Sequence, residues 1–316
     1  MNGKRYIATG LNMLDRVVVG DKEIGIYMGG IPMYGYAGMR PWVNNPEDIC
    51  YGARVGNDFF KNYDPWFHNN GIDEKDLLFV SDVTPYNTLY YSNDYEVADS
   101  IFFTGDFKDS AFWRPHGEDF NSWVGTNTRG IYTCSSANDP MWEQIFQLKK
   151  THTFKIMWEP NYVSTFPNSK EATLQLCQKI EMASFNVPEG CRIFGLENEK
   201  ELLKLLCSFN TELILLRCGA RGLYVIHNHK ATMIPSAPVP KETGVVDVTG
   251  CGNTSTAGAC VAWCEGNDPI MTGIMANVSA NLNLRQKGPY PLFDDLVCTM
   301  AAEWANQLYK EFKEER

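Results

Sequence analysis

The chain has 316 residues, of which 44% are hydrophobic and 21% are charged, an ordinary composition for a globular protein. Its formal net charge of −10, without a basic run, argues against nucleic acid or an anionic membrane as a partner. No apolar run approaches the roughly 20 residues that a membrane-spanning helix needs. The ten cysteines form no C-x-x-C pair, and the polar start of the chain is unlike a signal peptide. We therefore expect a cytoplasmic protein with reduced thiols.

In the first half of the chain, short apolar runs predict strands. Residues 5–19, RYIATGLNMLDRVVV, predict two strands separated by a bend, and residues 48–60, DICYGARVGNDFF, predict a strand that leads into a glycine turn. The glycine-rich and aromatic stretch 25–38, GIYMGGIPMYGYAG, is interpreted as a loop. Residues 80–107 combine strand-forming types with many polar ones, which predicts a small sheet apart from the main core.

The second half alternates helical and strand patterns, which favours an α/β fold. Helices are predicted over 141–150, 169–183, 254–264 and 294–312, and strands over 153–161 and at both ends of 211–230, with a glycine turn between the latter two. Residues 191–209, CRIFGLENEKELLKLLCSF, are interpreted as a short strand followed by a helix that starts near Asn198.

Residues 247–258, DVTGCGNTSTAG, place two glycines directly before one of these helices. Glycine lets a backbone approach a ligand closely and turn its N–H groups inward. The free N–H groups and the dipole of the helix that follows favour an anion there. Taken alone, such a glycine pair is more typical of a tight strand-to-helix turn without a ligand.

The same stretch is similar to the signature D-[TS]-x-G-A-G-D of the ribokinase-like (pfkB) carbohydrate kinases. The matching residues are Asp247, Thr249, Gly250 and Gly252, whereas Cys251 replaces the alanine and Asn253 replaces the second aspartate. Other family motifs follow one another in the right order, so that the resemblance extends from about residue 6 to residue 291.

These further motifs carry the candidate binding residues. In the first half they are GLNMLD with Asp15, GGIPMYGYA with Gly29, Gly30 and Tyr34 (the last in place of an asparagine), and GARVGNDFF with Asp58. In the second half, MWEPN resembles the family's D-P-N turn with Glu159 for the aspartate, and the candidate residues lie in NEKE (Asn198 and Glu201), LRCGARG (Arg217, Gly219 and Gly222) and NLRQKGPYP (Lys287 and Gly288).

The resemblance implies a mostly parallel, doubly wound α/β sheet with helices on both faces and a small β-lid, all within one domain of residues 1–316. The lid strands would lie within about 10–45 and 80–107. Because the lid often mediates dimerisation in this family, the resemblance also implies a homodimer.

The implied activity is transfer of the γ-phosphate of ATP to a hydroxyl of a sugar or sugar-like molecule. The acceptor would be bound by Asp15, Gly29, Gly30, Tyr34 and Asp58, and the nucleotide by Arg217, Gly219, Gly222, Lys287 and Gly288. The backbone of Gly250, Cys251 and Gly252 would hold the developing charge. Asn198 and Glu201 would organise Mg²⁺, although from spacing alone Asn198 is more typical of a helix N-cap.

Asn253 stands where the family has a catalytic aspartate. A neutral amide cannot accept the proton of an attacking hydroxyl, and loss of a general base typically costs about 10²–10⁴-fold in rate. One alternative to a sugar kinase therefore stays open, a catalytically impaired relative that binds a sugar or a nucleotide as a sensor or scaffold. A further alternative is a nucleoside kinase, since aromatic residues expected around the pocket mouth (Tyr36, Trp42, Tyr86, Tyr90 and Tyr91) could stack on a base.

Overall fold

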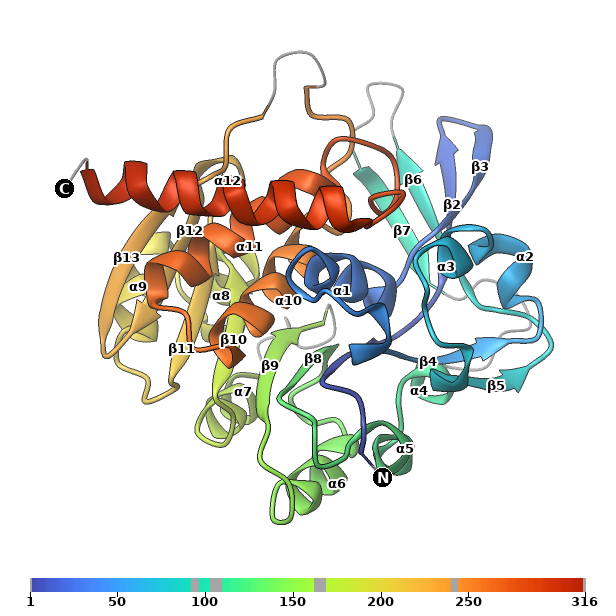
Figure 1. The fold of residues 1–316 in the computed structure, drawn as a ribbon, viewed down its shortest axis with the longest axis horizontal. Coiled ribbons are helices and arrows are strands. Elements are labelled where there is room, and N and C mark those ends of the chain that lie inside the picture. The colour runs from blue at the N-terminus through green and yellow to red at the C-terminus, as the bar shows by residue number, and fades with distance from the viewer. Residues whose placement is uncertain (1, 92–96, 103–109, 162–168, 240–243, 315–316) are drawn as a thin grey trace.

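The computed structural model describes residues 2–91, 97–102, 110–161, 169–239 and 244–314. In these residues the chain forms a nine-stranded sheet in the order β13-β12-β11-β10-β9-β8-β1-β4-β5 and a four-stranded sheet in the order β3-β2-β6-β7 (Figure 1). The strands are β1 (Tyr6–Gly10), β2 (Leu14–Val19), β3 (Lys22–Met28), β4 (Ile49–Gly56), β5 (Leu77–Ser81), β6 (Tyr86–Tyr91), β7 (Val97–Phe102), β8 (Gly130–Ser135), β9 (Lys155–Pro160), β10 (Met182–Asn186), β11 (Leu213–Arg217), β12 (Gly222–His227) and β13 (Lys230–Pro235).

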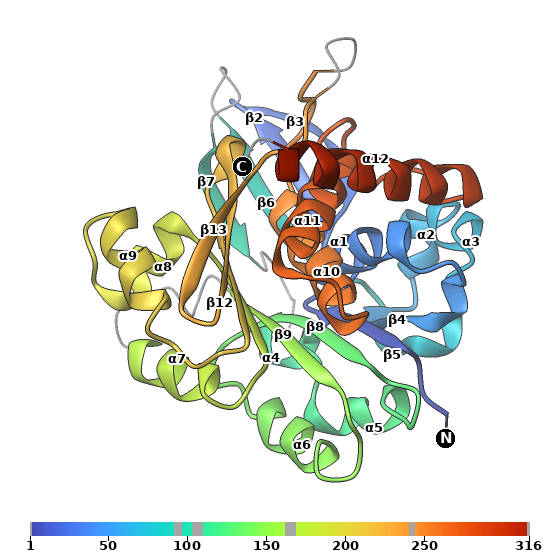
Figure 2. The same cartoon turned by 60° about the vertical axis from the view of Figure 1, so that its left-hand side comes forward.

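The large sheet is parallel from β11 to β5, and the hairpin β12–β13 extends it antiparallel at one edge. Helices cover both faces (Figure 2). The helices are α1 (Ile31–Met39), α2 (Phe59–Tyr63), α3 (Trp66–Asn69), α4 (Ser110–Trp113), α5 (Phe120–Trp123), α6 (Met141–Leu148), α7 (Lys170–Cys177), α8 (Val187–Phe194), α9 (Glu199–Leu206), α10 (Cys251–Cys264), α11 (Pro269–Asn283) and α12 (Asp295–Glu314).

Two buried clusters, one on each face, hold these layers together. One joins the sheet to α1, α10, α11 and α12, and the other joins it to α6, α7, α8 and α9. Every residue of β1 and β4 is buried, and both strands are mostly apolar, as is typical of parallel strands covered on both faces. In the described part of the chain, no helix combines the length and the apolarity that a membrane span requires.

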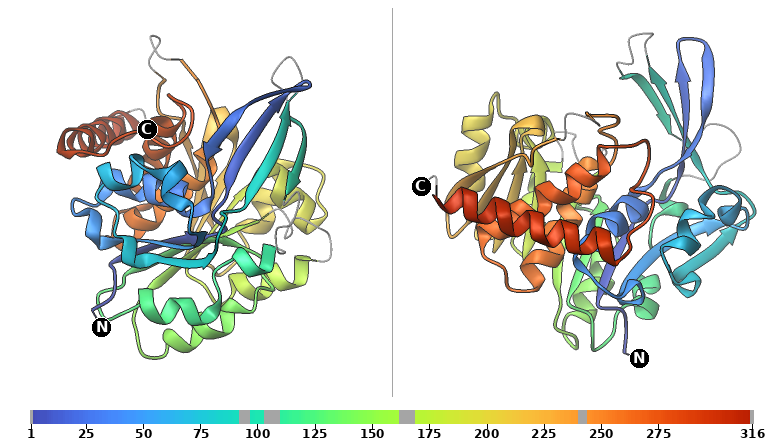
Figure 3. Two further views of the ribbon diagram at one scale, coloured as in Figure 1. Left: turned by 90° about the vertical axis from the view of Figure 1, so that its right-hand side faces the viewer. Right: turned by 45° about the horizontal axis from the view of Figure 1, so that its top comes forward.

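The four-stranded sheet projects from the body beside the carboxyl ends of the large sheet's strands (Figure 3). β2 pairs antiparallel with β3 and parallel with β6, which in turn pairs antiparallel with β7. The predicted fold class, a mostly parallel doubly wound sheet with a small β-lid, is confirmed. We call the four-stranded sheet the lid.

The prediction of a loop over 25–38 was wrong, because its second half forms α1. This helix begins after Gly30, whose φ is 95°, and all its residues from Pro32 to Met39 are buried. A Cβ at Gly38 would lie 2.2 Å from the carbonyl oxygen of Thr254 on α10. Glycine is a poor helix former, but here its lack of a side chain allows α1 and α10 to pack closely.

The predicted strand at the start of 191–209 was also wrong, because these residues end helix α8. Asn186 caps the start of α8 by accepting a hydrogen bond from the N–H of Glu189 at 2.8 Å, and Gly195 ends the helix in a left-handed conformation. The strand of this region is β10, which occupies the end of the helix predicted over 169–183.

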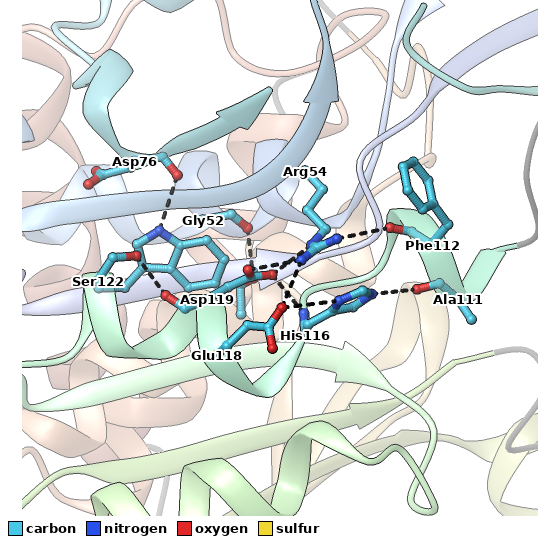
Figure 4. A network of polar contacts seen from close by, with 11 residues as sticks. Gly52, Arg54, Asp76, Ala111, Phe112, His116, Glu118, Asp119 and Ser122 are labelled. Atoms are coloured by element: carbon cyan, nitrogen blue, oxygen red, sulfur yellow. Dashed lines mark hydrogen bonds and ion pairs between the residues drawn. The ribbon is translucent and has the colours of Figure 1, made fainter. Parts of the chain in front are cut away.

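A buried ion pair attaches the segment that contains α4 and α5 to the large sheet. Arg54 of β4 donates from Nε and Nη2 to the two carboxylate oxygens of Asp119, at 2.8 and 3.1 Å (Figure 4). The carboxylate of Asp119 also accepts the N–H of His116, and Nη1 of Arg54 donates to the carbonyl of Phe112 on α4. This network sets the position of α4 and therefore of Arg114, the residue after it.

Candidate functional site

The candidate site lies where parallel strands end and helix α10 begins. Carboxyl ends of neighbouring parallel strands lie at the same edge of a sheet, where ligands bind in open α/β folds. Glu159 is the next-to-last residue of β9, Asn186 ends β10 and Arg217 ends β11. These three side chains come from adjacent strands and line one cavity.

Two glycines shape the start of α10. Gly250 has a φ of 76°, and a Cβ there would lie 2.2 Å from the ring of Tyr34. A Cβ at Gly252 would lie 1.9 Å from Nη1 of Arg217, so that any larger residue there would displace the guanidinium from its present position. No side chain among the described residues caps this helix. The first turn of a 14-residue helix therefore offers N–H groups to an anion, with a cation beside them.

Arg217 is a buried cation held between two carboxylates. Its Nη2 lies 2.7 Å from Oε1 of Glu159 and 3.7 Å from Oε2 of Glu189. Burial alone would lower the pKa of Arg217, but these two carboxylates outweigh burial and raise it. Burial raises the pKa of Glu189, whose Oε2 has no hydrogen-bond partner among the described residues.

Asn253 donates its amide N–H groups to two oxygens. Nδ2 lies 2.9 Å from the hydroxyl of Tyr132 and 3.4 Å from Oε2 of Glu159. Tyr132 in turn donates its hydroxyl hydrogen to the same oxygen of Glu159 at 3.0 Å. Burial, and then the charge of Glu159, raise the pKa of Tyr132 well above its ordinary value, so that Tyr132 stays a donor to Glu159.

Three cavities surround the start of α10. The central cavity, of about 510 Å³, is lined by Asn253, Glu159 and Glu189 together with Met13, Ile31 and Arg114. The strand-edge cavity, of about 380 Å³, lies over Gly219 and Gly222 beside α11. The lid cavity, also of about 380 Å³, lies under β2 and β3. Each has the size of a small-molecule site.

The central and strand-edge cavities meet at the start of α10. Asn186, Arg217 and Gly252 line both. The side chains of Val245 and Val248 line the strand-edge cavity and are 60% and 69% exposed. Exposed apolar side chains at the rim of a cavity are typical of a surface that a ligand covers.

The lid cavity brings together Asp15, Tyr34, Asp247 and Lys287. Burial, and then the charge of Asp247, raise the pKa of Asp15 to about 7. The carboxylate of Asp15 lies against Gly29, where a Cβ would be 2.3 Å from Oδ2.

Several predicted site residues thus lie together, but in more than one cavity. Arg217, Gly219 and Gly222 line the strand-edge cavity as a group. Lys287 and Gly288, which were expected beside them, line the lid cavity instead. This placement follows from the end of α11 at Asn283, because the chain turns toward the lid after that helix.

Six of the predicted residues line none of these three cavities in the described part of the chain: Gly29, Gly30, Asp58, Asn198, Glu201 and Gly250. Asp58 accepts hydrogen bonds from the N–H and the hydroxyl of Thr84 through Oδ1, at 2.7 and 2.8 Å. Asn198 caps α9 by accepting the N–H of Glu201, and its own amide donates to the Glu201 carboxylate at 3.0 Å. The structure therefore places Asn198 and Glu201 in an exposed helix cap, the alternative that the spacing itself favoured.

The sequence analysis passed over Asn186, Glu189 and Tyr132. The stretch NVPE, residues 186–189, has the same N-x-x-E spacing as NEKE, and only NVPE directly follows a strand of the parallel sheet. Recognising β10 would have distinguished the two. Tyr132 carries no signal of its own, because a tyrosine in a buried strand is ordinarily part of the core.

The whole arrangement is that of a known family. The family model "pfkB family carbohydrate kinase" matches residues 48–295. The chain belongs to the pfkB family. A nucleoside kinase of Methanocaldococcus jannaschii, described as an archaeal member of the ribokinase family, has a similar structure with 18% identity and a TM-score of 0.70, covering 97% of this chain and 100% of that one.

Two further solved structures show the same fold. A fructokinase of Vibrio cholerae, bound to fructose, ADP and calcium, is 18% identical with a TM-score of 0.72, covering 94% of this chain and 98% of its own. An adenosine kinase of Sinorhizobium meliloti is 14% identical with a TM-score of 0.71, covering 95% and 99%. No curated protein matches the chain.

Proposed function

We propose that this pfkB-family protein transfers the γ-phosphate of ATP to a hydroxyl of a sugar or sugar-like molecule. The observation that carries the proposal is the junction of two cavities at the uncapped start of α10, where Arg217 borders both. Phosphoryl transfer depends mainly on positioning and on stabilisation of charge. A cation and a helix N-terminus between two ligand-sized cavities supply both.

The strand-edge cavity suits the nucleotide. The exposed Val245 and Val248 offer apolar surface for a base, and the backbone of Gly219 and Gly222 lies open beneath it. The phosphates would then extend toward Arg217 and the backbone N–H of Gly252, where a phosphate oxygen would accept charge-assisted hydrogen bonds.

Asn186 and Glu189 fit a magnesium ion better than Asn198 and Glu201 do. Oε2 of Glu189 is buried without a hydrogen-bond partner and lines the central cavity beside Asn186, which lies at the junction. Mg²⁺ prefers oxygen ligands and commonly uses one or two carboxylates together with substrate phosphates. Bound there, the ion would neutralise phosphate charge.

The central cavity suits the acceptor, because it holds Asn253 next to the junction. The amide nitrogen of Asn253 faces Glu159 and Tyr132, so that its carbonyl oxygen is left to accept a hydrogen bond from an acceptor hydroxyl. Arg114, which also lines this cavity and follows the segment that the Arg54–Asp119 pair attaches to the sheet, would supply a further donor. Gly30 supports this cavity by packing against Asn12 and Met13.

A second candidate function is binding without turnover. The amide of Asn253 favours it, since this group cannot serve as a base. A binding protein of this kind would retain the cavities and shift its melting temperature with nucleotide or sugar, while consuming no ATP.

The test is ATP consumption by the purified chain over a panel of sugars, sugar acids and nucleosides. We expect acceptor-dependent formation of ADP and of a phosphorylated product, seen by mass spectrometry. The nucleosides belong in the panel because a nucleoside kinase and an adenosine kinase share this fold. If no acceptor is phosphorylated while ligands still raise the melting temperature, the protein is a binder and the kinase proposal is wrong.

A further inference from the structure

We infer that Glu159, rather than residue 253, takes the proton of the acceptor hydroxyl. The inference rests on the proposed kinase function and assigns a catalytic role to a residue outside the glycine turn. Its basis is the geometry of four side chains, those of Glu159, Asn253, Tyr132 and Arg217.

The orientation of the Asn253 amide follows from its neighbours. Both groups that it contacts, the hydroxyl of Tyr132 at 2.9 Å and the carboxylate of Glu159 at 3.4 Å, can be satisfied only by the NH₂ end. Tyr132 already donates its hydrogen to Glu159 and therefore accepts from Asn253. An amide oxygen in this position would face a carboxylate oxygen, which is repulsive. The amide is thus fixed with its nitrogen toward Glu159.

Glu159 is the carboxylate that stands nearest to the place of the missing aspartate. Its Oε2 lies 3.4 Å from Nδ2 of Asn253, and both residues line the central cavity. Its other oxygen, Oε1, is paired with Arg217 at 2.7 Å. The carboxylate is therefore anchored at one oxygen, while the other oxygen faces Asn253 and Tyr132 at the cavity wall.

The other acidic side chains nearby are placed less well. Asp247 lines the lid cavity, and its Oδ1 accepts the N–H of Thr249 at 2.9 Å, which holds the glycine turn. Asp15 also faces the lid cavity. Glu189 lines the central cavity, but it lies on the far side of Arg217 and suits the magnesium ion. Among the acidic residues that the structure describes, Glu159 both lines the central cavity and contacts Asn253.

The acceptor hydroxyl donates toward Oε2 of Glu159, while the carbonyl oxygen of Asn253 orients it. Its O–H bond breaks as the new O–P bond forms, and the bond from the γ-phosphorus to the bridging oxygen breaks with its electron pair leaving on ADP. The proton stays on Glu159 until it passes to water. Arg217, released from part of its pairing as Glu159 becomes neutral, remains free to hold phosphate charge.

Three variants test the inference. Glu159→Gln keeps the shape of the side chain and leaves a carbonyl oxygen for Arg217, so that the fold and ATP binding should persist. We expect it to lower kcat by about 10²–10⁴-fold. Asn253→Asp alone should give no gain in kcat, because it places a second carboxylate against Glu159. The double variant Glu159→Gln with Asn253→Asp exchanges acid and amide across the same contact, and it should recover most of the lost kcat.

The comparison variant is Asp247→Asn, which removes the other candidate carboxylate. All proteins are compared by kcat, by KM for the acceptor, by ATP binding in calorimetry and by melting temperature. Wild-type kcat in Glu159→Gln would overturn the inference while leaving the kinase function intact. The inference would also be overturned if the double variant bound ATP normally but had a kcat as low as that of Glu159→Gln. A wild-type chain without turnover on any acceptor would overturn both proposals.

Discussion

Asp15 offers a direct test of the electrostatics of the lid cavity, because its carboxyl is buried next to another acidic side chain. Burial and Asp247 raise its pKa from 3.8 to about 7. Between these two pH values the folded chain holds a proton that the unfolded chain releases, so that the free energy of unfolding falls as pH rises. Below about pH 4 both states are protonated, and this loss disappears.

The magnitude follows from the shift. About three pKa units at about 1.36 kcal/mol each give an upper limit near 4 kcal/mol above pH 7. Since the side chain of Asp15 retains some contact with solvent, we expect about 1–3 kcal/mol. Asp15→Asn removes the ionisation and keeps the shape. The variant should therefore be more stable than the wild type at pH 8, with a gain that shrinks as the pH is lowered toward 4.

Urea unfolding at intervals from pH 5 to pH 8 measures this gain. The matched control is Asp21→Asn at the exposed turn between β2 and β3 of the same lid, where neutralisation should leave the pH profile unchanged. A variant at position 15 that is less stable than the wild type at pH 8 would refute the reasoning. A gain that does not change with pH would refute it too.

Two further substitutions address the junction and the α4 segment. Gly252→Ala would place a Cβ 1.9 Å from Nη1 of Arg217, and displacing this charged donor should weaken ATP binding about 10–100-fold, as a calorimetric titration would show; an unchanged affinity would mean that Arg217 does not hold phosphate. Arg54→Met should cost about 3–5 kcal/mol in urea unfolding, because Asp119 would be left buried and unpaired. The exposed Arg16→Met serves as its control, because a solvent-exposed ion pair contributes little to stability, and equal losses in the two variants would contradict this account of the buried pair.

The sequence was sufficient to predict the fold class and the glycine turn, but not to predict which side chains contact that turn. Regular periodicity identified the strands that lead to Glu159 and Arg217, since a buried parallel strand reads as a short apolar run. Periodicity did not predict helix α1, because close packing against α10 requires glycine at positions where a good helix former would otherwise be expected.

The two N-x-x-E stretches show the limit of spacing as evidence. Both Asn186 and Asn198 cap a helix by accepting an N–H from the glutamate three residues on, and local sequence alone cannot rank them. What separates them is the strand that precedes Asn186 and delivers it to the carboxyl edge of the sheet. The contact between Asn253 and Glu159 joins residues that are 94 positions apart, and only the fold reveals it.

The position of Arg217 has a consequence for how the two ligands affect each other. One guanidinium forms part of the wall of both the central and the strand-edge cavities. Any ligand that draws this charge toward itself changes the electrostatic potential felt by its neighbour. Linkage then requires each ligand to alter the affinity of the other by the same factor. If the two cavities bind the nucleotide and the acceptor as proposed, the two binding equilibria would be coupled, and the dissociation constant of either ligand would depend on the concentration of the other.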